Sequence, residues 1–147
     1  MKAVGYYKSL PINKPDSLVD MEVPEPQSSG NDLLVQVKAI SVNPVDTKLR
    51  KRITPPESQS NVPGFDAPEV VVKTGSQASL FKPGDPVCLA GQSNWPGSNA
   101  EFQLVDERIA GRKPDSLTHS QAAALPLTAA TAYELLFDRI DILRDSR

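Results

Sequence analysis

Residues 62–91 constrain the fold of this chain more than any other stretch. Within them, Val70, Val71 and Val72 form a β-branched run, and such side chains fit best on a pleated, half-buried surface. Residues 82–85 have the sequence Lys-Pro-Gly-Asp, and proline followed by glycine at the two central positions is typical of a type II turn. Residues 87–90 are apolar and supply a returning strand. The stretch therefore predicts two strands joined by a corner as the nucleus of a mainly β domain.

Further strands are predicted where short apolar segments are bounded by turn residues. Residues 33–42 give the clearest pattern, with Gln36 and Lys38 on the exposed face. Two segments rich in polar residues are predicted to be loops, and the second of them carries Trp95, the only tryptophan. The other predicted strands cover residues 1–7, 18–23, 100–106 and 109–112, and the loops cover residues 53–61 and 92–99.

Short helices are predicted from capping signals. Asn43 suits the N-cap of a helix and Pro44 its first position. Thr118 with Gln121 three residues later fits a capping box for a second helix, which Pro126 is expected to end. A third helix is predicted over residues 128–143.

Charge and cysteine content limit the partners of the chain. The formal net charge is -2, and the short basic cluster at residues 48–52 is interpreted as a solvated helix end, so nucleic acid is not expected as a partner. Cys88 is the only cysteine, which excludes an internal disulfide and a cysteine-based zinc cluster. The sequence has neither the layout of a signal peptide nor an apolar run of membrane-spanning length, so we expect a cytoplasmic protein with no membrane partner.

A family resemblance is carried by an ordered set of motifs: Pro-Gly-Phe-Asp at residues 63–66, an apolar strand, Gly75, and Phe-Lys-Pro-Gly-Asp-Pro-Val at residues 81–87. The set resembles the N-terminal, GroES-like domain of medium-chain dehydrogenases/reductases, which include zinc alcohol dehydrogenases and zinc-free quinone oxidoreductases. The resemblance implies a partly open β-barrel with short helices over residues 1–126. Residues 127–147 would then form a helix and tail leading toward a cofactor-binding domain.

One pair of residues departs from this family pattern. Pro68 and Glu69 stand where the resemblance leads us to expect small residues such as alanine and glycine. Proline has no amide hydrogen to donate, so Pro68 is expected at the start of its strand or on an edge strand.

The positions of the family's zinc ligands carry other residues. Asn43 stands in place of the first catalytic cysteine ligand and Phe65 in place of the histidine ligand. The third ligand would fall near Ala124 or Leu125, and the cysteine-rich lobe that holds structural zinc is absent. Zinc requires cysteine, histidine or carboxylate donors, so we expect no zinc.

The residues at these positions resemble those of the zinc-free quinone oxidoreductase branch, in which NADPH is the cofactor. That resemblance implies that Asn43 and Thr128 border the nicotinamide. Asn43 would supply an amide donor, and Thr128 a hydroxyl at a helix N-terminus. Each residue could instead be an ordinary helix cap. Asp46 is either a capping carboxylate or a group that orients its neighbours in the cofactor cleft.

The substrate cleft is expected to be walled by Phe65 and Trp95, although Trp95 could equally anchor its loop. His119, the only histidine, has no nearby nucleophile or acid in the sequence pattern and receives no role. No catalytic residue is assigned.

No glycine follows Gly111, so the glycine-rich turn of a dinucleotide-binding half is not present within these residues. We therefore expect the substrate-side domain of a zinc-independent, NADPH-dependent quinone or enone oxidoreductase that is inactive as this chain and does not bind NADPH alone. The alternative is a stand-alone GroES-like binding or oligomerisation module without redox activity. A homodimer through the last helix is also expected, because its apolar stripe would lie uncovered; the stripe consists of Leu135, Leu136, Ile140 and Leu143.

Overall fold

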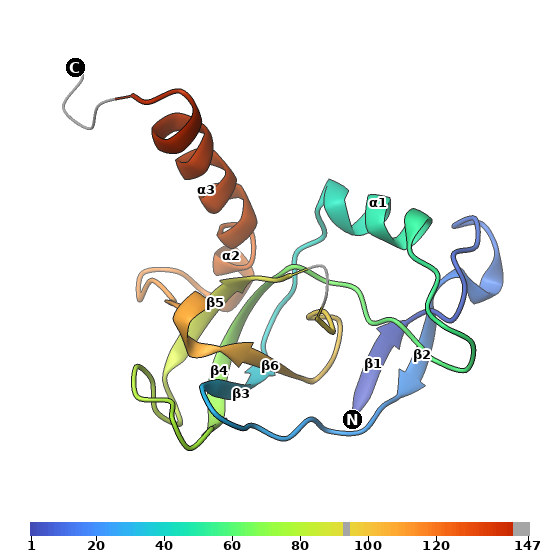
Figure 1. Ribbon diagram of the computed structural model, residues 1–147, viewed down its shortest axis with the longest axis horizontal. Helices are drawn as coiled ribbons and strands as arrows, with labels where there is room; N and C mark the ends of the chain where they lie inside the picture. The colour runs from blue at the N-terminus through green and yellow to red at the C-terminus, as the bar shows by residue number, and fades with distance from the viewer. Residues whose placement is uncertain (93–94, 143–147) are drawn as a thin grey trace.

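The computed structural model describes residues 1–92 and 95–142. The fold is mainly β, as predicted, and α3 projects away from the sheets (Figure 1). No helix in the described part of the chain is long and apolar enough to cross a membrane. The strands are β1 (Lys2–Gly5), β2 (Val19–Glu22), β3 (Asp32–Val37), β4 (Asp66–Thr74), β5 (Pro86–Ala90), β6 (Phe102–Asp106) and β7 (Gly111–Arg112).

The helices follow the predicted capping signals only in part. The α-helices are α1 (Pro44–Arg52), α2 (His119–Ala122) and α3 (Pro126–Tyr133), and α3 continues into a π-helical turn, η3 (Glu134–Arg139). Short 3-10 turns lie at η1 (Pro15–Ser17) and η2 (Glu107–Ile109). The predicted starts of α1 and α2 are confirmed, each with a capping box.

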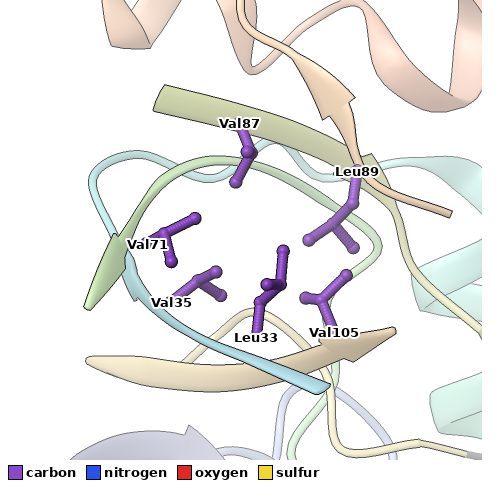
Figure 2. Packing of buried hydrophobic residues seen from close by; sticks show 6 residues of the cluster. All are labelled: Leu33, Val35, Val71, Val87, Leu89 and Val105. Carbon is purple, nitrogen blue, oxygen red and sulfur yellow. The ribbon is translucent and has the colours of Figure 1, made fainter. Parts of the chain in front are cut away.

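Five strands form an antiparallel sheet in the order β6-β3-β4-β5-β7, and β1 pairs with β2 in a second, smaller sheet. The predicted corner joins β4 to β5. Gly84 has a positive φ of 93°, and the N–H of Asp85 donates to the carbonyl of Lys82 at 3.1 Å, as in a type II turn. The larger sheet curls around an apolar cluster formed by Leu33, Val35, Val71, Val87, Leu89 and Val105 (Figure 2).

The expectation that Pro68 lies at a strand start or an edge is wrong, because it is the third residue of β4, a central strand. Its carbonyl accepts the N–H of Lys38 at 3.1 Å, so its nitrogen also points toward the chain of β3. Regular pairing of β3 with β4 ends at Val37 opposite Glu69, so Lys38 and Pro68 lie just beyond the last pair. The missing donor therefore falls where the ladder stops, and this also explains why β3 is shorter than the predicted strand at residues 33–42.

The basic cluster on α1 is only partly solvated. Lys51 and Arg52 are exposed, whereas Arg50 is buried. The guanidinium of Arg50 donates to the carbonyl of Leu10 at 2.8 Å, which holds the loop after β1 against the helix. The interpretation of this cluster as a solvated helix end is therefore wrong for Arg50.

The third helix begins two residues earlier than predicted. Pro126 is its first residue, a position that needs no amide donor, and it does not end α2. The apolar side chains beyond it, at Leu135, Leu136 and Ile140, are 39–56% exposed. The last described part of the chain thus has an uncovered apolar surface, and Leu143, the remaining residue of the expected stripe, lies outside the described residues.

Candidate functional site

The site is built around the start of α1, where Asn43 is the N-cap. Asn43 is 8% exposed, and its backbone N–H donates to Oδ2 of Asp46 at 2.7 Å within the capping box. Its side-chain Nδ2 donates to Oδ2 of Asp66 at 2.8 Å. The capping role of Asn43 is therefore present, and its amide group also contacts the first residue of β4.

Asp66 joins three parts of the fold. It begins β4, it is fully buried, and its Oδ1 accepts the backbone N–H of Leu127 at 2.8 Å. Leu127 is the second residue of α3, where the backbone N–H has no partner within the helix. One carboxylate thus binds the N-cap of α1 through one oxygen and the first turn of α3 through the other.

Burial dominates the pKa of Asp66. Loss of solvation raises this pKa above its ordinary value, the hydrogen bonds from Asn43 and Leu127 lower it, and the nearby Asp46 carboxylate raises it. Both bonds require an acceptor oxygen, so they favour the ionised form.

Asp46 binds the backbone of Asn43, whose side chain is bound to Asp66. Its Oδ2 accepts from Asn43, while its buried Oδ1 has no hydrogen-bond partner in the structure. The capping interpretation of Asp46 is confirmed by the capping box. Asp46 also lines a small cavity.

Phe65 and Trp95 line that same cavity, together with Asp46 and Gln92. The cavity has a volume of about 30 Å³, which is room for water but not for a quinone ring. Trp95 is 38% exposed and also lines a larger, mainly apolar groove of about 610 Å³. The structure therefore brings the two predicted cleft residues together around a space that is too small for the predicted substrates.

Two glycines allow the segments that carry Phe65 and Trp95 to approach closely. A Cβ on Gly97 would lie 2.3 Å from the carbonyl carbon of Pro63, and Gly64 has a positive φ of 122°. The N–H of Gly97 donates to the carbonyl of Val62 at 2.8 Å. Side chains larger than hydrogen at these positions would push the two segments apart.

The interpretation of Thr128 as a helix cap is wrong, whereas its hydroxyl does lie in the first turn of α3. Thr128 is the third residue of α3, because the helix starts at Pro126. Its hydroxyl donates to the carbonyls of Ala124 and Leu125 at 2.8 and 3.0 Å. The side chain is exposed, so its oxygen can still accept a hydrogen bond from outside.

The side chains at the family's zinc positions do not fit a zinc ion. Asn43 offers an amide already bonded to Asp66, and Phe65 offers a hydrocarbon ring, whereas zinc is bound by thiolate, imidazole and carboxylate. Within residues 1–92 and 95–142, no three His, Cys, Asp or Glu side chains gather as a candidate metal site.

Asp66 was missed by the sequence-based prediction, although it lies next to Phe65. The available signal was an acidic residue at the start of a strand that is otherwise apolar up to Val72, apart from Glu69. Such a residue needs donors, but the sequence does not show that α1 and α3 supply them.

The chain is similar in sequence and structure to several known proteins. A zinc-type alcohol dehydrogenase-like protein of Staphylococcus epidermidis is 43% identical over 145 residues, covering 99% of this chain and 43% of the relative. A Rhizobium etli protein classed with zinc-dependent alcohol dehydrogenases has a crystal structure with a TM-score of 0.92 and 52% identity, covering 99% of this chain and 43% of that one. Escherichia coli quinone oxidoreductase, in complex with NADPH, matches with a TM-score of 0.79 and 29% identity over 92% of this chain and 40% of its own.

The chain thus spans less than half the length of these relatives. Residues 29–115 match the alcohol dehydrogenase GroES-like domain. The match covers more than half of the chain and agrees with the fold seen in the structure. The chain therefore belongs to the alcohol dehydrogenase GroES-like domain family, within the medium-chain dehydrogenase/reductase superfamily.

Proposed function

We propose that this chain is the substrate-side domain of a zinc-independent, NADPH-dependent quinone or enone oxidoreductase. The observation that carries the proposal is the pair Asn43 and Phe65 at the zinc positions, with Asn43 held by Asp66. An amide donor and an apolar ring at these two positions suit a carbonyl acceptor better than a metal ion. The likeness to an NADPH-bound quinone oxidoreductase supports the choice of cofactor and substrate class.

In this proposal, bound NADPH supplies the hydride and the residues of the chain orient the reacting groups. Asn43 has a second N–H that is not used by Asp66 and can donate to a carbonyl oxygen. Thr128, whose hydrogen is committed to backbone carbonyls, would accept from the nicotinamide carboxamide. Phe65 and Trp95 would exclude water from the reacting carbon.

The small cavity beside Phe65 means that the substrate site is incomplete in these residues. A quinone would occupy the mouth of the cavity, with the remaining walls coming from outside the part of the chain that is described. We therefore expect weak quinone contact and no measurable NADPH binding by the 147-residue chain. Submillimolar NADPH binding in isothermal titration calorimetry would contradict this division of roles.

A direct test uses nitrogen-15-labelled protein titrated with duroquinone, whose ring carbons are methylated so that Cys88 adds to it slowly. We expect shift changes at the Asn43 side chain and at the amides around Phe65, and weaker changes in F65L. Changes confined to the groove on the other side of Trp95, near Val23 and Leu104, would contradict the proposed substrate position. Stoichiometric zinc in the purified protein, measured by mass spectrometry of the metal, would contradict the zinc-independent mechanism.

We further propose that the chain forms a homodimer through the apolar side chains beyond α3, since Leu135, Leu136 and Ile140 are exposed. The double variant L135S/I140S should remain monomeric at protein concentrations where the wild type associates, as measured by sedimentation velocity. A wild type that stays monomeric at high concentration would remove this proposal. It would also weaken the alternative function, a stand-alone oligomerisation module, which the same exposed surface favours.

A further inference from the structure

We propose that Asp66 is a positioning residue that sets the orientation of the Asn43 side chain and the placement of α3 together. The inference rests on the proposed function, in which Asn43 orients the carbonyl group. It adds that the position of α3 and the orientation of that donor depend on each other. The link between them is a single buried carboxylate with one oxygen for each partner.

The geometry limits how either partner can move alone. Both bonds to the Asp66 carboxylate are 2.8 Å long, and the carboxylate is planar, so rotating it to follow one donor moves the other oxygen away from its own donor. Asp66 is fully buried, so water cannot replace a lost partner without opening the site. A shift of the first turn of α3 therefore changes the direction of the Asn43 amide.

The backbone around Asp66 resists compensation by the strand. The carbonyl of Asp66 accepts the N–H of Ser41 at 3.1 Å, and Asp66 pairs with Ala90 on β5. The base of α3 contacts β4 and β5. Because the strand is held on both sides, movement at α3 is passed to the side chain of Asp66 and from there to Asn43.

The exchange rate of the Leu127 amide proton measures whether the hydrogen bond to Asp66 is intact. It lies in the first turn of α3, so its only acceptor is Asp66 and no helical hydrogen bond protects it. In hydrogen–deuterium exchange followed by NMR, D66N should accelerate exchange at Leu127 by about tenfold, because an amide has one acceptor oxygen for two donors.

The reciprocal variant N43D/D66N separates positioning from general stability. There the amide introduced at position 66 can donate to the carboxylate introduced at position 43, while its oxygen accepts from Leu127. Both links are then restored with donor and acceptor exchanged. We expect protection at Leu127 to return to within about twofold of wild type. Continued fast exchange in the double variant would overturn the proposal.

Coupling itself is tested with N43A. If Asp66 links the two partners, N43A should accelerate exchange at Leu127, although the N–H donor of Leu127 is untouched. N31A is the matched control, since the side-chain amide of Asn31 also donates hydrogen bonds, in its case to Glu107 and Gln77, away from α3. Equal exchange at Leu127 in N43A, N31A and wild type would overturn the proposal.

These measurements need neither cofactor nor substrate. If quinone does not contact Asn43 but N43A still accelerates exchange at Leu127, the proposed function is refuted and the link through Asp66 is not. Quinone contacts at Asn43 without coupling would do the reverse.

Discussion

An acidic side chain is buried at the start of β4 and another in its middle, and the two differ in their hydrogen bonding. Asp66 and Glu69 are both fully buried on the same strand. Asp66 receives two hydrogen bonds, whereas neither carboxylate oxygen of Glu69 has a partner in the structure. Loss of solvation is the one cause that raises the pKa of Glu69 well above its ordinary value, while for Asp66 the hydrogen bonds oppose that rise.

The difference follows from what each face of the strand meets. Positions three apart on a strand lie on opposite faces. Asp66 faces the starts of α1 and α3, where helix termini supply donors without partners. Glu69 pairs with Val37 on β3 and Val87 on β5, so it shares the face of the apolar cluster in Figure 2. A buried acid is accommodated where helices begin, and is unfavourable inside the barrel.

The largest effect is expected from D66L. Leucine has a similar size but accepts no hydrogen bond, so it leaves the Asn43 amide and the Leu127 N–H buried without partners. We expect the free energy of unfolding to fall by about 3 kcal/mol, measured by urea denaturation. A loss below about 1 kcal/mol would show that water reaches these donors and would weaken the contrast with Glu69.

The same change at the other position should have the opposite sign. E69L removes a buried carboxyl group with no partner and extends the apolar cluster, so we expect a gain of about 1–3 kcal/mol at pH 8. E69Q is the matched control, because its amide remains polar and without partners, and it should gain less. Destabilisation by E69L would mean that Glu69 has a partner that the structure does not contain.

The pH dependence of stability should come mainly from Glu69. Its pKa is raised in the folded state, so its contribution is fully present below the ordinary glutamate pKa of about 4.3 and is lost as pH rises through the raised value. In urea denaturation between about pH 5 and pH 9, the wild type should lose up to about 1.4 kcal/mol per pH unit over part of this window. E69Q should flatten the curve more than D66N, and equal curves for E69Q and wild type would contradict the assignment.

The smallest effect is expected at Cys88, whose thiol responds to both acids. Burial raises the pKa of Cys88, the cation of Lys113 lowers it, and the charges of Glu69 and Asp66 raise it. The thiol pKa, measured from iodoacetamide alkylation rates against pH, should fall in E69Q and fall less in D66N. K113A should raise it, and this variant serves as the control for the sign of the charge effect.

Much of the barrel could be predicted from local sequence. The type II turn at Gly84 and the helix starts at Asn43 and Thr118 depend on short motifs whose chemistry is local, and all three are present. The position of Pro68 was mispredicted because the rule for proline in strands concerns the sheet neighbour that would receive its hydrogen bond. The residues around Pro68 do not indicate at which residue β3 stops pairing with β4.

The candidate site was predicted less completely. The resemblance singles out Asn43 and Phe65, and the place of Trp95 on a loop suggests that residue. Asp66 is missed because its partners lie 23 and 61 positions away in sequence. Thr128 was assigned a donor role because the helix start was placed two residues late. Contacts between distant segments therefore limited the prediction more than the identity of the side chains.

The π-helical turn at Glu134–Arg139 has a consequence for Ile140 and Ile142, which follow it. Here the N–H of Ile140 bonds to the carbonyl of Leu135, five residues back, so the turn holds one residue more than an α-helical turn. One residue corresponds to a rotation of about 100° around the axis. Deleting a single residue from this turn would therefore let it close as an α-helical turn, with Ile140 and Ile142 on the side that they now occupy, whereas the same deletion within α3 would rotate both residues by that angle.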